Sequence, residues 1–406
     1  NWLIVARRLR RYSANLEAIT VPQFLSLRFH DQRNLLNALG AVIIIVFFVP
    51  YTASGFAACG KLFHSLFGVD YMAAMVVSAC VIVGYTITGG FRAVTTTDLI
   101  QSIVMSLALV AVLVYGIGAA GGWDAVVANA QSLPGYLTMM ASHNAAEGTA
   151  TSYSLLDIVS TMAWGLGYFG MPHIIIRFMS LKSEKELRKS SVIGISWTTI
   201  ILIMSALTAI AGRLYLGEIE DSSTVFITMV RRIFPALVSG LLLSAILSAA
   251  MSTADSQLLA ASSAFASDVY KPVIRKKASD SEMLWAGRIV VIVIAVVALM
   301  IASDPNSGSI MGLVENAWGV FGAAFGPVIL LSLFWKRLTF GGTVAGIAVG
   351  AAVDILWLVF LSSTDIYEIV PGFAAGLLAA VVVSLLSKGP GKDVEDLFDR
   401  AVDLKS

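Results

Sequence analysis

Long stretches of apolar residues, separated by short polar segments, dominate this chain. Each stretch is continuous rather than alternating, which favours helices over strands. Each is also long enough to cross the roughly 30 Å hydrocarbon core of a bilayer. We therefore predict an all-α polytopic membrane protein with about ten spanning helices. They are expected at residues 35–63, 70–90, 94–120, 153–178, 190–214, 235–266, 284–303, 309–335, 341–362 and 367–387.

Lys and Arg are concentrated in every second loop between these stretches. Basic loops tend to stay on the cytoplasmic side, and the bias keeps its phase through every predicted crossing. Both ends of the chain are therefore predicted to be cytoplasmic. The loops assigned to that side contain Arg7, Arg8, Arg10, Arg11, Arg28, Arg33, Arg92, Lys182, Lys185, Arg188, Lys189, Lys271, Arg275, Lys276, Lys277, Lys336, Arg337, Lys388, Lys392, Arg400 and Lys405. The alternate loops contain Lys61, Arg213, Arg231 and Arg232.

The composition agrees with a lipid environment. Hydrophobic residues make up 57% of the chain and charged residues 13%, with a mean hydropathy of +0.83. Soluble domains average about 25% charged residues, so this chain has too few polar residues to cover a water-exposed surface. We assign residues 1–390 to one transmembrane transporter domain and residues 391–406 to a short cytoplasmic tail.

The residue types that mark most enzymes are sparse. Cys59 and Cys80 both lie in apolar runs and form neither a disulfide framework nor a metal cluster. A glycine-rich phosphate loop before a Lys-Ser/Thr pair is also missing, which argues against an ATP-driven pump. The histidines are far apart and lack metal-ligand spacing; they are His30, His64, His143 and His173. The chain is therefore predicted not to be an enzyme, and any energy for transport should come from an ion gradient.

The predicted span at 153–178 contains residues that weaken a helix. Three glycines and a proline crowd the run from Trp164 to His173. Transporters use helices broken at membrane depth to present backbone groups to a solute. On a helical path Trp164, Tyr168 and Pro172 share one face, which suits a small solute with an apolar body. The alternative is close helix packing through glycine, with the aromatic residues at the membrane interface.

The predicted span at 235–266 carries a face of small and hydroxyl-bearing residues. Ala249, Ser252, Thr253 and Ser256 recur at helical spacing. Hydroxyl and carbonyl oxygens can replace the hydration shell of a monovalent cation such as Na⁺. The alternative is a small-residue packing stripe, with Ser and Thr bonding back to their own helix.

Few acidic residues lie within the predicted spans. Asp98 follows three threonines near a predicted helix start, and Asp255 lies beside the hydroxyl face. Either could tune ion coupling. The alternatives are helix capping for Asp98 and a hydrogen bond within the bundle or to cytoplasmic water for Asp255. Glu315, near a predicted helix end, is assigned no role.

These segments together resemble the sodium/solute symporter family. The resemblance extends over essentially the whole chain, and the run from Trp164 to His173 is most similar to the sodium/proline symporters within that family. The other matching motifs are Arg177-Phe-Met179, Tyr51-Thr-Ala-Ser-Gly55, Tyr85-Thr-Ile-Thr-Gly-Gly-Phe91, Ser244-Ala-Ile-Leu-Ser-Ala-Ala-Met-Ser-Thr253 and Ala317-Trp-Gly-Val-Phe-Gly-Ala-Ala-Phe-Gly-Pro327.

The resemblance implies a leucine-transporter-like inverted-repeat bundle of thirteen helices, of which about three N-terminal ones are expected to be missing here. It implies sodium-coupled symport of a small solute, L-proline above others, by alternating access in the cell inner (plasma) membrane. It implies a sodium site at the Ala249 carbonyl and the Ser252 and Thr253 hydroxyls. The implied solute site comprises Trp164, Tyr168, Pro172 and Tyr51, and Asp98 and Asp255 are candidate coupling residues.

Two other functions stay open from the residues alone. One is symport of another amino acid, a carboxylate or a vitamin by a member of the same family. The other is a transporter-like membrane domain that acts as a sensor. In either case the expected partners are a small solute, sodium and the lipid bilayer, with no nucleic acid.

Overall fold

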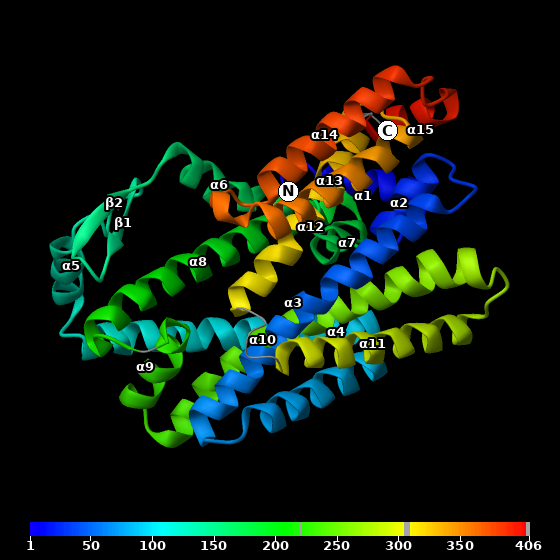
Figure 1. Cartoon of the computed structure of the whole chain (residues 1–406). Helices are drawn as coiled ribbons and strands as arrows, with labels where there is room; N and C mark the ends of the chain where they lie inside the picture. The colour runs from blue at the N-terminus through cyan, green and yellow to red at the C-terminus, as the bar shows by residue number, and fades with distance from the viewer. Residues whose placement is uncertain (220, 304–308, 403–406) are drawn as a thin grey trace.

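The computed structural model describes residues 1–219, 221–303 and 309–402. Within that part of the chain, eight helices are long and apolar enough to cross a membrane. They are α3 (Leu35–Phe67), α4 (Tyr71–Ala119), α8 (Glu184–Leu216), α10 (Ala236–Ala264) with its π-helical extension η2 (Phe265–Ile274), α11 (Asp280–Ser303), α12 (Ile310–Phe334), α13 (Phe340–Phe360) and α14 (Ile369–Leu386). Figure 1 shows them as one elongated bundle.

The first difference from the ten predicted spans lies in α4, which holds two of them. Its 49 residues would extend about 70 Å as one straight helix, more than twice the width of the hydrocarbon core. The backbone leaves the helical region at Gly90, with φ 60° and ψ −165°, values that glycine adopts without steric cost. Figure 1 shows that α4 doubles back on itself rather than running as one straight helix. The predicted boundary between 70–90 and 94–120 therefore lies at Gly90.

The second difference lies at residues 153–178, where the chain forms two short helices. α6 (Leu155–Gly167) and α7 (Pro172–Met179) are separated by a four-residue turn. Neither helix is long enough to span the bilayer alone. With α4 counted as two spans and α6–α7 as one broken span, the ten predicted runs all correspond to helices.

The remaining elements lie between or beside the spans. α1 (Ala6–Asn15) and α2 (Val21–Arg28) precede α3. The predicted 121–152 loop contains α5 (Trp123–Ser132) and an antiparallel hairpin of β1 (Ala141–Asn144) and β2 (Thr149–Ser152), in which Ala141 faces Ser152. The short 3-10 helix η1 (Ser222–Thr224) and the helix α9 (Val225–Ile233) lie between α8 and α10. A second 3-10 helix, η3 (Ser362–Thr364), lies between α13 and α14. The hairpin lies outside the apolar runs, so it leaves the helical assignment of the spans unchanged.

α12 is the central helix of the bundle. In its most apolar stretch 83% of the residues are buried, a larger share than in any other spanning helix. Glycines of the neighbouring helices allow their backbones to approach it. A Cβ atom on Gly350 of α13 would lie 2.2 Å from the Ala323 carbonyl oxygen, and one on Gly376 of α14 would lie 2.9 Å from it. Such small-residue contacts are typical of membrane helix packing.

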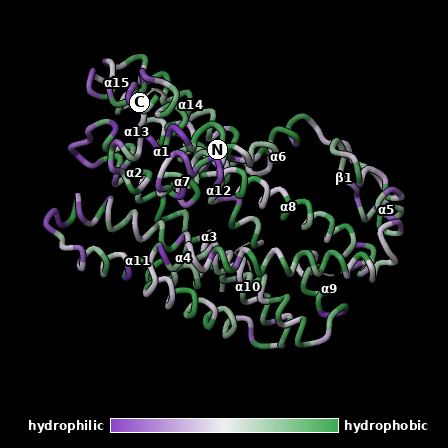
Figure 2. Tube along the Cα trace, turned by 180° about the vertical axis from the view of Figure 1, so that it is seen from behind, coloured by the Kyte–Doolittle hydropathy of each residue, from purple (hydrophilic) through white to green (hydrophobic). Residues whose placement is uncertain are grey.

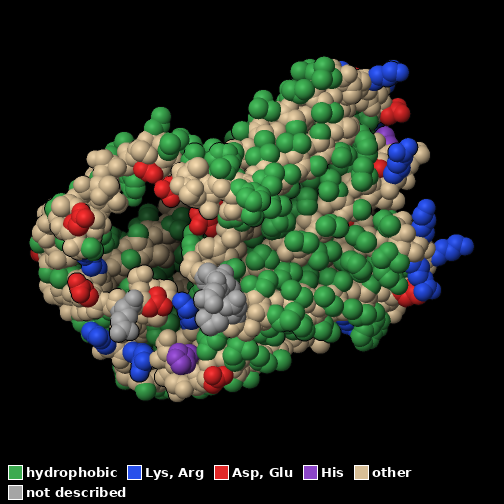
Figure 3. Space-filling model, in the orientation of Figure 1, with side chains coloured by type: hydrophobic (Ala, Val, Ile, Leu, Met, Phe, Trp, Pro, Cys, Tyr) green, Lys and Arg blue, Asp and Glu red, His purple; other side chains and the backbone are tan. Residues whose placement is uncertain are grey.

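Basic segments from distant parts of the sequence meet at one end of the bundle. Arg8 Nη1 donates to the Leu333 carbonyl oxygen at 2.9 Å, and Arg337 Nη2 donates to the Ser387 carbonyl oxygen at 2.9 Å. Arg10 Nη2 donates to the Lys182 carbonyl oxygen at 3.3 Å. Figure 3 shows a largely hydrophobic surface along the helices, with Lys and Arg side chains at this end and a second group of charged side chains at the opposite end. Figure 2 shows the hydrophilic segments of this end from behind.

The predicted cytoplasmic tail forms a helix that docks at the basic end. α15 (Lys392–Val402) buries Val394, Phe398 and Ala401 against the bundle. Lys336 Nζ lies 2.6 Å from Asp399 Oδ2, and this hydrogen bond raises the pKa of the Lys336 ammonium group. The last four residues of the predicted tail, Lys405 among them, lie outside the described residues.

Candidate transport site

The break between α6 and α7 follows from the local sequence. The Ser154 side chain caps α6 by accepting from the Asp157 backbone N–H at 3.1 Å, and the Asp157 carboxylate accepts from the Ser154 N–H at 2.7 Å. At the other end Pro172 has no N–H to donate and holds the preceding residue, Met171, in an extended conformation. The helix therefore stops at Gly167 and restarts at Pro172, as the sequence predicts.

Two glycines of the break let it lie directly against α12. A Cβ atom on Gly167 would lie 1.9 Å from Trp318 Nε1, and one on Gly170 would lie 2.0 Å from the Phe321 carbonyl oxygen. A Cβ atom on Gly165, by contrast, would meet nothing within 4 Å. Glycine packing is thus part of the explanation for Gly167 and Gly170, and it occurs together with the broken helix rather than instead of it.

An aromatic cluster surrounds the end of α6. The rings of Trp164 and Trp318 stack with centroids 5.0 Å apart, and Trp318 Nε1 donates to the Trp164 carbonyl oxygen at 2.9 Å. Tyr168 meets Trp318 edge-on at 4.8 Å, and Tyr367 stacks on Trp164 at 6.2 Å. We call Trp164, Tyr168, Trp318 and Tyr367 the aromatic cluster. It presents flat apolar surface next to an unwound stretch of backbone.

The four predicted solute-site residues do not all belong to the aromatic cluster. Trp164 and Tyr168 both contact Trp318. The helical path is interrupted before Pro172, so the common face predicted from spacing extends only over Trp164 and Tyr168. Pro172 is the first residue of α7 and is buried. Tyr51 of α3 is buried, and its ring centroid lies 6.0 Å from that of His173, which follows Pro172.

The predicted sodium oxygens converge on α10. Ser252 Oγ donates to the Ala249 carbonyl oxygen at 3.1 Å, and Thr253 Oγ1 donates to the same oxygen at 3.0 Å. All three residues are half-buried, whereas the next two, Ala254 and Asp255, are buried. The hydroxyls thus bond back to their own helix, as the alternative interpretation expects. The same arrangement holds three hard oxygen atoms together on one partly open face.

Asp98 and Asp255 belong to one polar network that joins three helices. Arg177 Nη2 of α7 donates to Asp98 Oδ2 at 2.7 Å and to Ser256 Oγ at 2.8 Å. Ser256 Oγ lies 3.4 Å from Asp255 Oδ1, and the Tyr85 hydroxyl donates to Asp255 Oδ2 at 2.7 Å. Asp98 therefore has an ion-pair partner rather than a capping role, and the network ties α4 and α10 to the helix that follows the break.

Sequence reasoning missed some members of this region. Trp318 and Tyr367 complete the aromatic cluster, and Arg177 is the centre of the polar network. Trp318 lies in a run that matches the family pattern, and Arg177 directly follows the broken segment. Their roles could not be assigned because both depend on contacts between residues at least 79 positions apart in the sequence.

A bundle of membrane-spanning helices with one helix broken beside an aromatic cluster is the architecture of a secondary transporter rather than an enzyme. The chain belongs to the sodium:solute symporter family, whose model matches residues 1–350. The fold and the presence of an unwound helix segment were thus both predictable from the sequence.

Several proteins are similar along nearly the whole chain. The High-affinity proline transporter PutP of Bacillus subtilis (strain 168) is 43% identical over 411 residues, covering 100% of this chain and 85% of the relative. The Osmoregulated proline transporter OpuE of the same organism is 41% identical, covering 98% and 80%. A Sodium/proline symporter of Staphylococcus aureus is 39% identical, covering 100% and 80%.

Two solved structures share the fold. A Na⁺-coupled sialic acid symporter in a substrate-bound outward-open state matches with a TM-score of 0.76 at 18% identity, covering 96% of this chain and 80% of that chain. MHP1, a nucleobase-cation-symport-1 family transporter, matches with a TM-score of 0.55 at 15% identity, covering 97% and 86%. They confirm the predicted leucine-transporter-like architecture.

Proposed function

We propose that this protein carries out sodium-coupled symport of L-proline by alternating access. The observation that carries the proposal is the helix broken between Gly167 and Pro172 beside the aromatic cluster, in a chain whose relatives are named for proline transport. The pyrrolidine ring of proline offers apolar surface to the aromatic cluster. The carboxylate and ammonium groups of proline suit the unwound backbone at a helix break.

The proposed solute site comprises Trp164, Tyr168, Pro172 and Tyr51, extended by Trp318. The two tryptophan rings are already stacked, so the site holds rigid aromatic surface that needs little ordering when solute binds. Tyr51 approaches from α3 near His173, across the break from α6. Solute binding is thereby linked to the relative positions of α3, α6 and α12.

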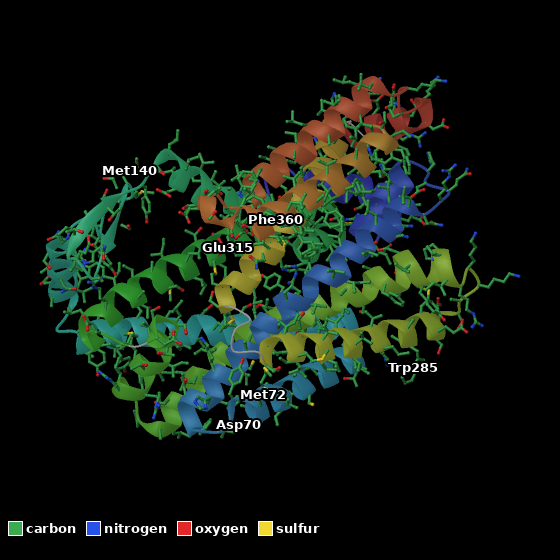
Figure 4. All side chains as sticks on the ribbon, in the orientation of Figure 1. Asp70, Met72, Met140, Trp285, Glu315 and Phe360 are labelled. Carbon is green, nitrogen blue, oxygen red and sulfur yellow. The ribbon has the colours of Figure 1, made fainter. Side chains whose placement is uncertain are left out.

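We expect Trp164→Ala to weaken proline affinity about tenfold or more, because truncating a well-packed aromatic residue at a binding surface costs about 2 kcal/mol or more. Isothermal titration with proline in sodium checks this. The matched control is Trp285→Ala. Trp285 is 59% exposed on α11, and Figure 4 shows it far from Glu315, whose carbonyl oxygen accepts from Tyr367 of the aromatic cluster. Equal proline affinity in the two variants would place the solute site elsewhere.

The proposed sodium site uses the Ala249 carbonyl and the Ser252 and Thr253 hydroxyls. Each hydroxyl lies within 3.1 Å of the Ala249 carbonyl oxygen through its own hydrogen bond. Rotating both hydroxyls away would release the Ala249 oxygen from these two bonds and make it available to an ion. Asp98 and Asp255 are proposed to couple ion and solute, because their network connects α10 with α7 through Arg177 and Ser256.

A sodium gradient supplies enough free energy for this task. One charge moving through 100 mV gives about 2.3 kcal/mol, and a tenfold concentration gradient adds about 1.4 kcal/mol. Together they support roughly a few hundred-fold accumulation of a neutral solute. One sodium ion per cycle is therefore sufficient to scavenge a zwitterionic amino acid.

The proposed location is the cell inner membrane with the basic end of the bundle in the cytoplasm. The gathered Lys and Arg side chains at that end support this orientation. Cysteine accessibility tests it: a cysteine placed at Lys276 should react only with reagents that cross the membrane. One at Glu147, in the hairpin turn, should react with impermeant reagents in whole cells.

Uptake competition separates proline from other solutes. Labelled proline uptake by the full-length protein is measured with an excess of unlabelled proline, other amino acids, carboxylates or vitamins. The proposal expects proline to compete most strongly. Stronger competition by another solute would keep the transporter class but change the substrate, and binding without uptake would favour a sensor.

A further inference from the structure

Two carboxyl groups meet inside the bundle, behind the aromatic cluster. Asp354 of α13 is fully buried, and Glu368, just before α14, is 8% exposed. Both point at Gly319 of α12: a Cβ atom on that glycine would lie 3.1 Å from Asp354 Oδ1 and 3.3 Å from Glu368 Oε1. The two carboxyl groups therefore lie beside the same position of α12, which carries no side chain of its own.

Neither carboxyl group has a counter-charge. Both carboxyl oxygens of Asp354 and Oε1 of Glu368 are buried and without a hydrogen-bond partner among the described residues. The ion pairs within that part of the chain involve neither residue. Burying an unpaired carboxylate is strongly unfavourable, and two neighbouring carboxylates repel each other as well. A positive species is needed to make this arrangement stable.

The packing around Asp354 favours a proton over a metal ion. A Cβ atom on Gly372 of α14 would lie 2.8 Å from Asp354 Cβ, so α14 packs directly on this side chain. The Asp354 side chain is thus enclosed by residues of this chain on the α12 and α14 sides. A metal ion would need several oxygen ligands around it, whereas a proton needs only the two carboxyl groups themselves.

We propose that Asp354 and Glu368 form a proton-binding site in which one proton is shared between the two carboxyl groups. One carboxyl group is protonated while the other stays ionised. Binding forms one O–H bond with a proton taken from water, and the pair then carries one negative charge. Release returns that proton to water and leaves two facing carboxylates.

The groups described next to this pair supply no positive charge. Glu315 lies on α12, one turn before Gly319, and Tyr367 precedes Glu368; the Tyr367 hydroxyl donates to the Glu315 carbonyl oxygen at 2.9 Å. Trp357 of α13 is the neighbouring polar side chain on the same helix, with its Nε1 unpartnered. Figure 4 shows Glu315 and Phe360, the last residue of α13, at the same end of the bundle. A proton relieves the repulsion within this set without needing any further ligand.

The proton should affect the solute site, and this consequence rests on the proposed function. Glu368 adjoins Tyr367, which stacks on Trp164, and Gly319 adjoins Trp318. When the pH rises and the shared proton leaves, repulsion between Asp354 and Glu368 should push α13 and α14 away from α12. The aromatic cluster then loses its stacked arrangement, so proline affinity should fall as the pH rises through this step.

Infrared spectroscopy of the full-length protein in lipid vesicles tests the site independently of transport. A protonated carboxyl group has a carbonyl stretching band that a carboxylate lacks, and the wild type should show this band and lose it in one step as the pH rises. Asp354→Asn and Glu368→Gln should each remove the band, and Glu315→Gln, as the matched control, should keep it. A wild type with no such band, or a band retained in both pair variants, would overturn the proposal.

Proline affinity as a function of pH provides the second readout. Above the pH at which the shared proton leaves, the proline affinity of the wild type should fall by about tenfold per pH unit, the slope for one proton. Asp354→Asn and Glu368→Gln should both be flat over the same range, because each leaves only one carboxyl group and removes the repulsion between the two. An affinity in both variants that still follows the wild-type pH curve would contradict the link to the solute site. Failure to bind proline at any pH would refute the proposed function and leave the infrared result standing.

Discussion

Replacing Thr253 or Ser252 by alanine is expected to raise the sodium concentration for half-maximal proline uptake about tenfold or more. Each substitution removes one hydroxyl from the set that converges on the Ala249 carbonyl oxygen. A polar contact to a charged group contributes about 1.5–3 kcal/mol, and 1.4 kcal/mol corresponds to a factor of ten in affinity. Sodium-activation curves measured at saturating proline report the change directly.

Two substitutions elsewhere control for the loss of a helix-bound hydroxyl. Ser262→Ala on the same helix removes a hydroxyl that donates to Leu259, and Thr208→Ala on α8 removes one that donates to Met204. Both should leave the sodium requirement near that of the wild type. If Ser252→Ala and Thr253→Ala behave like these controls, the two hydroxyls only pack within α10 and sodium binds at another place.

Gly170→Ala is expected to abolish most transport by displacing the broken helix from α12. The new methyl group would lie 2.0 Å from the Phe321 carbonyl oxygen, and a backbone atom cannot swing away as a flexible side chain could. Overpacking of this kind costs about 1–3 kcal/mol even where side chains can adjust. Proline uptake per folded transporter, with thermal stability of the purified protein, separates a functional defect from a folding defect.

Gly165→Ala is the matched control for Gly170→Ala, because Gly165 lies in α6 just before the break and is also a glycine. A methyl group there meets nothing within 4 Å, and alanine favours helix over glycine by about 1 kcal/mol. This variant should be as stable as the wild type or slightly more so. If alanine were tolerated equally at both positions, the close contact between the break and α12 would not be required for transport.

Much of the fold could be predicted because a bilayer imposes simple rules on sequence. Apolar length marked the spans, and the boundary between the runs 70–90 and 94–120 matches the non-helical Gly90 inside α4. The break near Pro172 was predictable because proline and glycine act locally on the backbone. The hairpin at 141–152 was missed because its strands are short, polar and outside the apolar pattern.

The site was only partly predictable because its contacts are long-range. Trp164 and Tyr168 were found from local spacing, but Trp318 and Tyr367 come from other helices. Asp98 looked like a cap until the fold brought Arg177 to it. The pairing of Asp354 with Glu368 depends on where Gly319 of α12 lies, which neither local sequence reveals.

Uptake of labelled proline by the full-length protein in proteoliposomes tests the central claim most directly. An inward sodium gradient with a negative interior should drive transient proline accumulation above equilibrium. Replacing sodium by potassium, or collapsing its gradient with an ionophore, should remove this accumulation. Accumulation that persists without a sodium gradient, or a sodium gradient that drives no proline uptake, would contradict sodium–proline symport.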